Sequence, residues 1–349
     1  MNRLSLIVFA FFSLNTSAQI NEIKSASDNA QEKMNPGARK QDVLAFDKLK
    51  YVNPFVGTGG HGHTYPGASA PFGMMQLSPD TRHDGWDGCS GYHYSDSLIY
   101  GFSHTHLSGT GVSDYGDLLI VPQIGKPKID PGYISSSGYQ ATFSHKDEIA
   151  SPGYYSVKLN DGEMNVRLTV SERAGYHQYF FNEKSGKKFI LIDLDHRDKL
   201  LCSAINLIDK TTISGNRVSE AWAEEQYFHF YLKMDTPYQK VRIFKKDGRN
   251  KLLLIFPKST KQISIKVGMS HVSEDGAKMN LEKELPDWNF ETAKARVQKK
   301  WRAELDKISF YSKESEVMNN FYTALYHSYL NPNISSDVDG KYRYADTIH

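Results

Sequence analysis

The chain has 349 residues, with 42 Lys and Arg against 40 Asp and Glu and a formal net charge of +2. This length suits about two domains, and the near balance of charge lacks the basic patch that a phosphate backbone requires, which argues against nucleic acid as a partner. The 21 Tyr and 18 Phe suit either a β-rich core or a surface that stacks on sugar rings.

The first residues have the pattern of an export signal. Asn2-Arg3 supplies a short positive start, and an apolar run from Leu4 to Leu14 precedes small residues that suit cleavage. We predict a signal peptide over 1–18 and no membrane span, because the apolar run is too short for a permanent anchor. The mature chain is then secreted or periplasmic, where Cys89 and Cys202 could pair, although nothing in their spacing requires a disulfide.

The next two segments differ in composition. Residues 19–48 are polar without a sustained period and are predicted to form a mobile leader. From Tyr51 to about Ser103 the chain is dense in Gly, Pro, Asp and His, which is typical of long ordered loops. Loops of this kind commonly carry a functional site.

Short β-type runs then fill the chain from Asp117 to Ser270. Turn signals such as Asp247-Gly248 separate the runs, and no helical pattern intervenes. This order indicates an antiparallel β-sandwich, which we predict over 49–275. The predicted strands are Leu118–Pro122, Tyr154–Leu159, Val166–Val170, Tyr176–Phe181, Phe189–Leu194, Tyr227–Met234, Val241–Phe244, Leu252–Phe256 and Ile263–Val267.

The apolar period changes from Asp287 onward. Residues recur at spacings of three and four, which predicts an amphipathic helix in a linker over 283–308. Its apolar positions are Phe290, Ala293, Val297, Trp301, Leu305 and Ile308. A second helical pattern follows Ser315, with apolar positions at Val317, Phe321, Leu325 and Tyr329. Two such helices cannot bury both their faces, so we expect 309–349 to be the start of a truncated helical domain.

The stretch 53–67 places five glycines near His61 and His63. Glycine lets the backbone approach a ligand or adopt a positive φ. The stretch is not a phosphate loop, because it lacks a Lys-Ser/Thr ending and a following helix pattern. A compact loop with structural glycines stays open as the alternative.

Trp86 stands among Asp and Gly residues in the run from Asp84 to Gly88, where no hydrophobic period would bury it. Such a Trp is either the plug of a small local core or a platform for the apolar face of a sugar. In the second case, neighbouring Asp oxygens accept hydrogen bonds from sugar hydroxyls. We favour the platform.

A zinc hydrolase is a rival hypothesis. His104 and His106 would lie on one face of an extended strand, a geometry that zinc can use, and His61 and His63 could do the same. No His-Glu-x-x-His pattern exists, and the nearby acids have no spacing that specifies a metal. Hydrogen-bonding histidines in a site wall, or in ordinary loops, are therefore favoured.

Glycoside hydrolysis requires two carboxyl groups that flank the scissile bond. Acids are numerous here, so spacing alone selects no pair. Glu172 lies in a β-patterned segment and is interpreted as a salt-bridged strand residue. No catalytic residue is assigned within the chain.

Six motifs of the chain form a recognisable combination, namely Asn53 to Gly60, Tyr65 to Gln76, Ser90 to Tyr94, Gly101 to Gly111, Phe321 to His327 and Ser336 to Gly340. Together they resemble the N-terminal part of the glycoside hydrolase family 92 α-mannosidases. The resemblance implies an N-terminal β-sandwich, a helical linker and the first helix of a truncated (α/α)6 barrel. It also implies calcium-dependent, inverting removal of terminal α-linked mannose from N-glycans or mannans. The catalytic carboxylates and most calcium ligands would lie downstream of His349, so the chain alone would be inactive.

The resemblance also suggests site residues. Trp86 matches the family's pocket tryptophan, and Asp87, Gly59, Gly60 and His104 lie in matching motifs of the pocket wall. The implied partners are mannose-containing glycans, and the implied cofactor is calcium. A standalone carbohydrate-binding module is the alternative, although it would have no use for an unfinished helix pair with exposed apolar faces.

Overall fold

The computed structural model describes residues 46–133, 137–160, 162–182, 186–246 and 249–349. The predicted signal peptide over 1–18, and the predicted leader up to residue 45, lie outside the described residues. The chain divides into two units, 1–47 with 309–311 and 48–308 with 312–349. All elements below belong to the second unit. No helix of the described ranges is long and apolar enough to cross a membrane.

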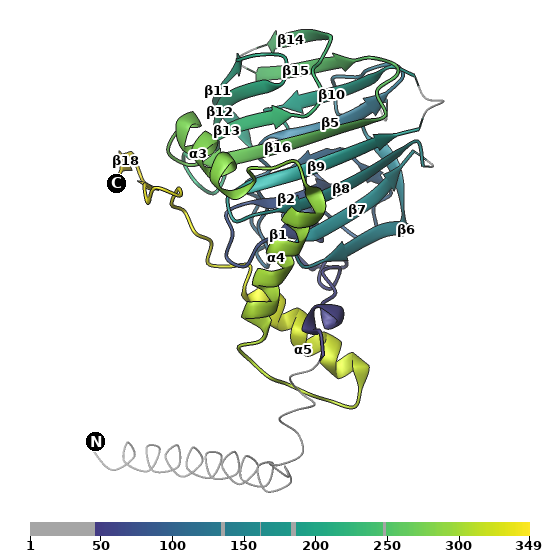
Figure 1. Cartoon of the computed structure of the whole chain (residues 1–349), viewed down its shortest axis with the longest axis vertical. Coiled ribbons are helices and arrows are strands. Elements are labelled where there is room, and N and C mark those ends of the chain that lie inside the picture. The colour runs from purple at the N-terminus through teal and green to yellow at the C-terminus, as the bar shows by residue number, and fades with distance from the viewer. Residues whose placement is uncertain (1–45, 134–136, 161, 183–185, 247–248) are drawn as a thin grey trace, which may run out of the picture. The chain divides into compact units, whose positions relative to one another are not determined.

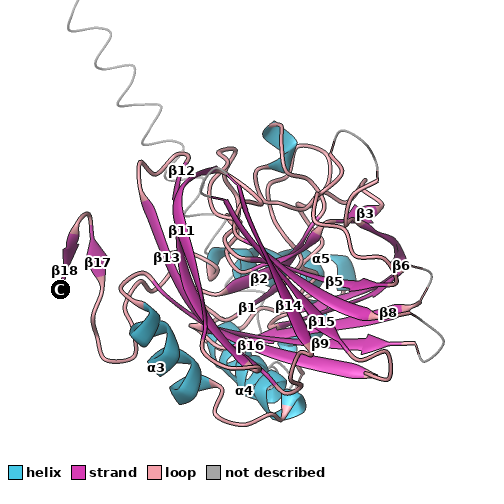
Figure 2. Ribbon diagram, turned by 90° about the horizontal axis from the view of Figure 1, so that it is seen from above, coloured by secondary structure: helices cyan, strands magenta, loops and turns pink. Residues whose placement is uncertain are grey.

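Two antiparallel sheets make up most of this unit (Figures 1 and 2). The first has the strand order β1-β2-β4-β5-β10-β15-β14, and the second has the order β11-β12-β13-β16-β9-β8-β7-β6-β3. The first sheet contains β1 (Ala68–Ser69), β2 (Gln76–Asp80), β4 (Gly101–Ser103), β5 (Leu119–Ile124), β10 (Lys188–Asp193), β15 (Arg249–Phe256) and β14 (Lys240–Lys246). The second contains β11 (Lys199–Leu207), β12 (Thr212–Glu220), β13 (Gln226–Met234), β16 (Gln262–Ser270), β9 (Ala174–Phe181), β8 (Met164–Val170), β7 (Tyr154–Leu159), β6 (Ala141–Ser151) and β3 (Leu98–Ile99).

The predicted antiparallel, mainly β fold is confirmed. Each predicted strand has a counterpart, and the prediction for β7 matches its bounds. Central strands such as β10, which pairs with β5 and β15, are buried along their whole length, which is why they read as apolar runs. The edge strand β11 was not predicted. It is largely exposed, so it lacks a clear apolar pattern, and it is recognised as a strand only by its pairing with β12.

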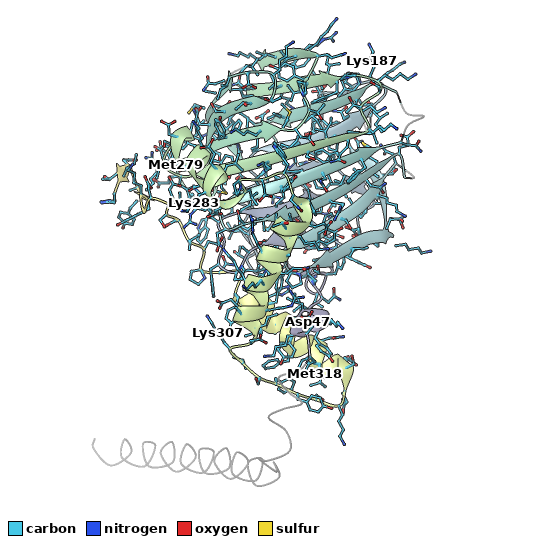
Figure 3. The ribbon with its side chains drawn as sticks, viewed as in Figure 1. Asp47, Lys187, Met279, Lys283, Lys307 and Met318 are labelled. Carbon is cyan, nitrogen blue, oxygen red and sulfur yellow. The ribbon has the colours of Figure 1, made fainter. Side chains whose placement is uncertain are left out.

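The helix α3 (Glu274–Glu284) was also not predicted. It begins at Ser273, whose Oγ accepts a hydrogen bond from the backbone N–H of Gly276 at 3.0 Å, as an N-cap does. Its outer face carries Met279 and Lys283 (Figure 3), and its inner face packs on β16. Few of its residues are apolar, so the sequence shows no clear period.

The helix α4 (Phe290–Leu305) confirms the predicted amphipathic pattern. Asn289 caps it, because its Oδ1 accepts a hydrogen bond from Thr292 N–H at 3.0 Å. Its buried residues are Phe290, Ala293, Val297, Trp301 and Leu305. The sixth predicted position, Ile308, lies beyond the helix and is exposed.

The helix α5 (Ser315–Ser328) forms where it was predicted, but the predicted apolar face is wrong. The buried residues are Met318, Tyr322, Thr323 and Tyr326, a face turned by about 100° from the predicted one, which is one residue of helical rotation. Tertiary contacts select it. The ring of Tyr322 lies 6.1 Å from that of Tyr51 in η1 (Lys48–Tyr51), and the ring of Tyr326 lies 4.6 Å from that of Trp301.

The remaining described elements are short. They are η2 (Trp86–Gly88) and a C-terminal hairpin of β17 (Arg343–Tyr344) and β18 (Thr347–Ile348). Cys89 is buried and Cys202 is exposed, and both are free thiols, so the two do not form a disulfide.

We expect Trp301→Ala to lower the free energy of unfolding by about 3–5 kcal/mol, the usual cost of deleting a buried Trp. Trp301 is fully buried, and its indole N–H donates to the carbonyl oxygen of Ser69 at 2.7 Å. Urea denaturation followed by circular dichroism measures the change. Trp288→Ala, at a Trp that is 42% exposed, is the control and should cost no more than about 1 kcal/mol. Equal losses in the two variants would contradict the packing role.

Candidate functional site

Four of the five predicted site residues lie in neighbouring loops, which we call the tryptophan loop group and define as residues 53–67, 80–94 and 105–116. The first two loops are joined by backbone and side-chain hydrogen bonds. The N–H of Tyr94 donates to the carbonyl oxygen of Thr58 at 2.8 Å, and His93 Nε2 donates to that of Gly60 at 2.9 Å. The predicted residues Gly59, Gly60, Trp86 and Asp87 are therefore brought together.

Trp86 is 58% exposed, so it is not the plug of a local core. The His63 ring meets the indole edge-on, with centroids 4.3 Å apart and an interplanar angle of 77°. Gly111 passes so close that a Cβ atom there would collide with the indole Nε1. The indole is thus supported by His63 and the backbone of the third loop, while most of its surface faces solvent.

Asp87 places a carboxylate beside this indole. Its Oδ1 lies 3.0 Å from Nδ1 of His61, and this hydrogen bond is the main reason that the pKa of Asp87 lies below its ordinary value. An ionised carboxylate is an acceptor only. It therefore suits the hydroxyl donors of a ligand that covers Trp86.

Gly59 and Gly60 leave open space on the side where a side chain would begin. Gly60 has φ +60°, and a Cβ atom there would meet no other atom within 4 Å. At Gly59, a Cβ atom would make an ordinary contact with Tyr94 at 3.5 Å. Backbone conformation, rather than crowding, accounts for glycine at Gly60.

His104 is not part of this surface. Its side chain is buried, its Nδ1 donates to the carbonyl oxygen of Leu118 at 2.7 Å, and its Nε2 lies 3.0 Å from Nε2 of His177. Burial lowers the pKa of His104 to about 4, so it is neutral near pH 7. Both ring nitrogens are engaged within the protein, and the geometry gives His104 a packing role between the loop and β9.

The zinc hypothesis finds no support in this geometry. His106 is buried, with Nδ1 2.8 Å from the carbonyl oxygen of Gln76 and Nε2 3.4 Å from Asp80 Oδ1. Within the described ranges, no group of three or more His, Cys, Asp or Glu side chains could hold a metal ion. The residues described here therefore do not by themselves fit a zinc or a calcium ion.

Arg197 links two loops of the tryptophan loop group through hydrogen bonds. This role was not predicted from the sequence. Its guanidinium donates to the carbonyl oxygens of Gly88 at 2.6 Å and Cys89 at 3.0 Å, and to Ser113 Oγ at 3.0 Å. Arg197 therefore ties the end of η2 to the third loop. The available signal was a charged run, Asp195 to Asp198, directly after a buried strand.

A buried ion pair anchors Arg197 in turn. Arg217 of β12 pairs with Asp117 and also donates to the carbonyl oxygen of Arg197. The other carboxylate oxygen of Asp117 accepts from Thr105 Oγ1 at 2.8 Å and from the side-chain amide of Gln226. The pair joins the third loop, the segment after β10 and two strands of the second sheet.

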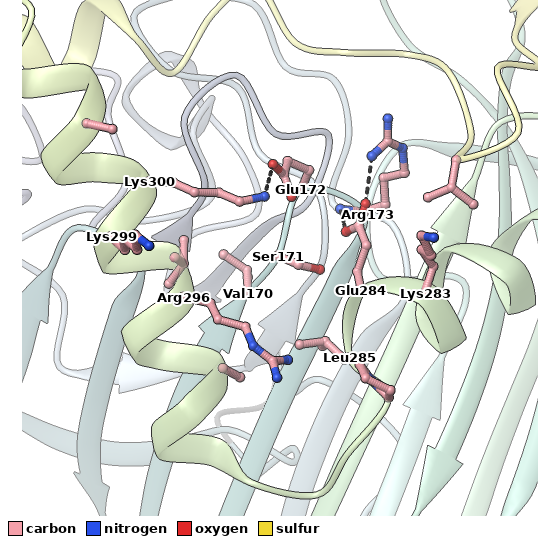
Figure 4. A pocket seen from close by; sticks show the side chains of 15 residues that line it. Val170, Ser171, Glu172, Arg173, Lys283, Glu284, Leu285, Arg296, Lys299 and Lys300 are labelled. Atoms are coloured by element: carbon pink, nitrogen blue, oxygen red, sulfur yellow. Dashed lines mark hydrogen bonds and ion pairs between the residues drawn. The ribbon is translucent and has the colours of Figure 1, made fainter.

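Another hollow lies between α4, the turn from β8 to β9 and the connection after α3 (Figure 4). It has a volume of about 890 Å³ and includes none of the five predicted residues. Glu172 lies here, paired with Lys300. The predicted ion pairing of Glu172 is confirmed, but Glu172 sits in the turn rather than in a strand.

An antiparallel sandwich that presents an exposed tryptophan and a carboxylate on glycine-rich loops has the surface of a carbohydrate-active protein. Residues 51–270 match the Glycosyl hydrolase family 92 N-terminal domain, and residues 276–349 match the Glycosyl hydrolase family 92 catalytic domain. The chain belongs to glycoside hydrolase family 92, as its motifs predicted.

Solved structures of similar proteins include α-mannosidases of this family. One from Bacteroides thetaiotaomicron is 34% identical, with a TM-score of 0.81 over 87% of this chain and 44% of that chain, and it has also been solved in complex with mannoimidazole. A family GH92 inverting mannosidase from Bacteroides thetaiotaomicron VPI-5482 is 25% identical, with a TM-score of 0.75 over 87% of this chain and 43% of that one.

A curated relative is described as an uncharacterized secreted glycosidase of Arthroderma benhamiae. It is 31% identical over 324 residues, which cover 82% of this chain and 42% of the relative. The chain thus spans less than half the length of the proteins that it matches.

Replacing Arg197 should expose Cys89. Burial slows its reaction and raises the pKa of its thiol. Arg197→Ala removes hydrogen bonds to a charged donor, which contribute about 1.5–3 kcal/mol each, so we expect at least about tenfold faster reaction of Cys89 with Ellman's reagent. A Cys202→Ser background leaves one thiol to follow. Arg296→Ala, at an exposed arginine, should change nothing, and an unchanged rate in Arg197→Ala would contradict the support role.

Asp198 makes stability depend on pH. Burial raises its pKa to about 7, Arg217 offsets only part of this rise, and its Oδ2 has no hydrogen-bond partner among the described residues. Because the unfolded pKa is about 3.9, the charged form destabilises the folded state above pH 7, and this penalty disappears as the pH falls toward 4.

Asp198→Asn removes this charge and tolerates the local φ of +61°. Three pKa units correspond to about 4 kcal/mol, and partial solvent exposure reduces this figure. We therefore expect a gain of about 2 kcal/mol in the free energy of unfolding at pH 8 that shrinks by more than half at pH 5, measured by urea denaturation. The control is Asp346→Asn, at an exposed carboxylate. It should change the free energy of unfolding by no more than about 0.5 kcal/mol at either pH. A gain that is the same at pH 5 and pH 8 would refute the assignment.

Proposed function

We propose that this chain is part of an exported exo-α-mannosidase that removes terminal α-linked mannose from N-glycans or mannans. The observation that carries the proposal is the exposed Trp86, supported by His63 and flanked by Asp87, in a chain of glycoside hydrolase family 92. The match of residues 276–349 to the catalytic domain favours an enzyme over a standalone carbohydrate-binding module.

The described residues would form one wall of the mannose pocket. Trp86 stacks on the apolar face of the sugar, and Asp87 accepts a hydrogen bond from a hydroxyl. The open backbone at Gly59 and Gly60 lets the ring approach closely. His104, which the resemblance assigned to this wall, acts from behind it through its contacts with Leu118 and His177.

The reaction class we propose is inverting hydrolysis. It uses a general acid and a general base whose carboxyl groups lie about 6.5–9.5 Å apart, which leaves room for the attacking water. A family relative is named an inverting mannosidase, which supports this class. Following the resemblance, we place the acid, the base and most ligands of a required calcium ion in the part of the protein that follows His349.

Export is part of the proposal. The relative from Arthroderma benhamiae is described as secreted, and residues 1–18 have the pattern of a signal peptide. The mature protein would then meet its glycan outside the cytoplasm.

We expect the 349-residue chain to release no mannose from α-linked mannobioses, with or without added Ca²⁺. A protein extended to the length of its relatives should release it, and EGTA should abolish the release. Trp86→Ala in the extended protein should lower kcat/KM by at least about tenfold, since covering a large apolar side chain contributes about 1.5–3 kcal/mol and about 1.4 kcal/mol is a factor of ten. Trp288→Ala is the matched control. Turnover by the 349-residue chain would contradict its proposed inactivity, and EGTA-resistant turnover would contradict the calcium requirement.

A further inference from the structure

A second exposed tryptophan, Trp222, lies in the loop between β12 and β13. Of the four tryptophans it is the most exposed, at 71%. It borders a cleft of about 490 Å³, within the range of about 300–1,000 Å³ that is usual for ligand pockets. The lining residues that carry the argument are Asp114, Tyr115, Trp222, Glu225, Tyr227 and Arg343.

Asp114 provides a fixed acceptor in this cleft. Its side chain is buried, one carboxylate oxygen accepts from the N–H of Tyr115 at 3.1 Å, and the other accepts from the N–H of Ala223 at 3.1 Å. Each carboxylate oxygen has a second acceptor position. The second of these hydrogen bonds also holds the backbone of Ala223, which follows Trp222 in the chain. It therefore links the position of the Trp222 loop to that of the Asp114 carboxylate.

Tyr227 and Arg343 form the other side. The guanidinium carbon of Arg343 lies 4.0 Å from the centre of the Tyr227 ring, and its Nε donates to the carbonyl oxygen of His271 at 2.8 Å. Among the described residues, no acceptor is bonded to the two Nη atoms of Arg343. The hydroxyl of Tyr227 donates to Glu225 at 2.5 Å. The cleft therefore offers both acceptors and donors around aromatic faces.

The cleft is continuous with the tryptophan loop group. The loop 105–116 passes Trp86 at Gly111, accepts a hydrogen bond from Arg197 at Ser113 and reaches the cleft at Asp114. One loop thus contributes to both exposed tryptophans.

We propose that this cleft is a second carbohydrate-binding site, which takes one hexopyranose unit of a neutral oligosaccharide with Trp222 as its stacking platform. A pyranose combines an apolar face with hydroxyls that donate and accept, as this lining requires. An anionic ligand would be repelled by the charges of Asp114 and Glu225, and an apolar segment would offer no donor to the remaining acceptor positions of these carboxylates. The choice of mannose as the sugar, but not the site itself, rests on the proposed function.

Fluorine NMR tests the site on the intact 349-residue chain. Incorporation of 5-fluorotryptophan gives one resonance for each tryptophan, and single Trp→Phe variants assign them. During titration with α-1,2-mannobiose, we expect a saturable shift of the Trp222 resonance. The exposed Trp288 and the buried Trp301 should not move. The shift of Trp222 should persist in Trp86→Phe, because the two sites are separate.

Two variants test the lining. Glu225→Gln and Arg343→Gln should each weaken the mannobiose response of Trp222 by about tenfold, the usual effect of losing a hydrogen bond to a charged group. Neither should alter the response of Trp86. Lys283→Gln, at an exposed lysine outside the cleft, is the matched control.

The outcomes separate this inference from the proposed function. A Trp222 resonance that stays still with mannobiose, cellobiose and galactobiose, or that moves only together with Trp288, overturns the second site. A saturable shift of Trp222 with any of these disaccharides supports it. A still Trp86 resonance in the same titration with mannobiose counts against the mannose pocket, whatever Trp222 does.

Discussion

Asp117 and Arg217 form a buried ion pair on which the loops that carry Trp86 depend. Burying two charges is favourable only when their remaining hydrogen-bonding positions are also satisfied. Here Thr105 and Gln226 donate to the carboxylate, and the guanidinium also donates to the carbonyl oxygen of Arg197. The pair therefore fixes the third loop, the segment after β10 and two strands of the second sheet at one point.

The support extends from this pair to the surface in two steps. Arg197, oriented through its own carbonyl, donates to Gly88 and Cys89 at the end of η2. Trp86 is the first residue of η2. Although its side chain is not buried in a core, its backbone is therefore held in a defined position by the hydrogen bonds of Arg197. Exposed loops with few buried contacts otherwise open easily. The same third loop reaches the cleft at Trp222, which makes both aromatic surfaces depend on one buried anchor.

Local patterns predicted the strands and the buried face of α4, because side chains that pack on a core repeat with the period of their element. The same reasoning failed for α5, where two possible apolar faces exist and contact with Trp301 and Tyr51 selects the other one. The resemblance, in turn, grouped His104 with Trp86 because both lie in motifs that match the family's pocket wall. Folding separates them, since His104 turns inward to His177.

The sequence by itself determined the antiparallel β class and the helix at α4, because turn chemistry and apolar period are local properties of the chain. Only the tertiary structure decided which polar side chains meet. Asp117 and Arg217 stand 100 positions apart, and Arg197 reaches Gly88 across 109. Such pairs leave no period in the sequence, since they depend on the register of strands that belong to different parts of the chain.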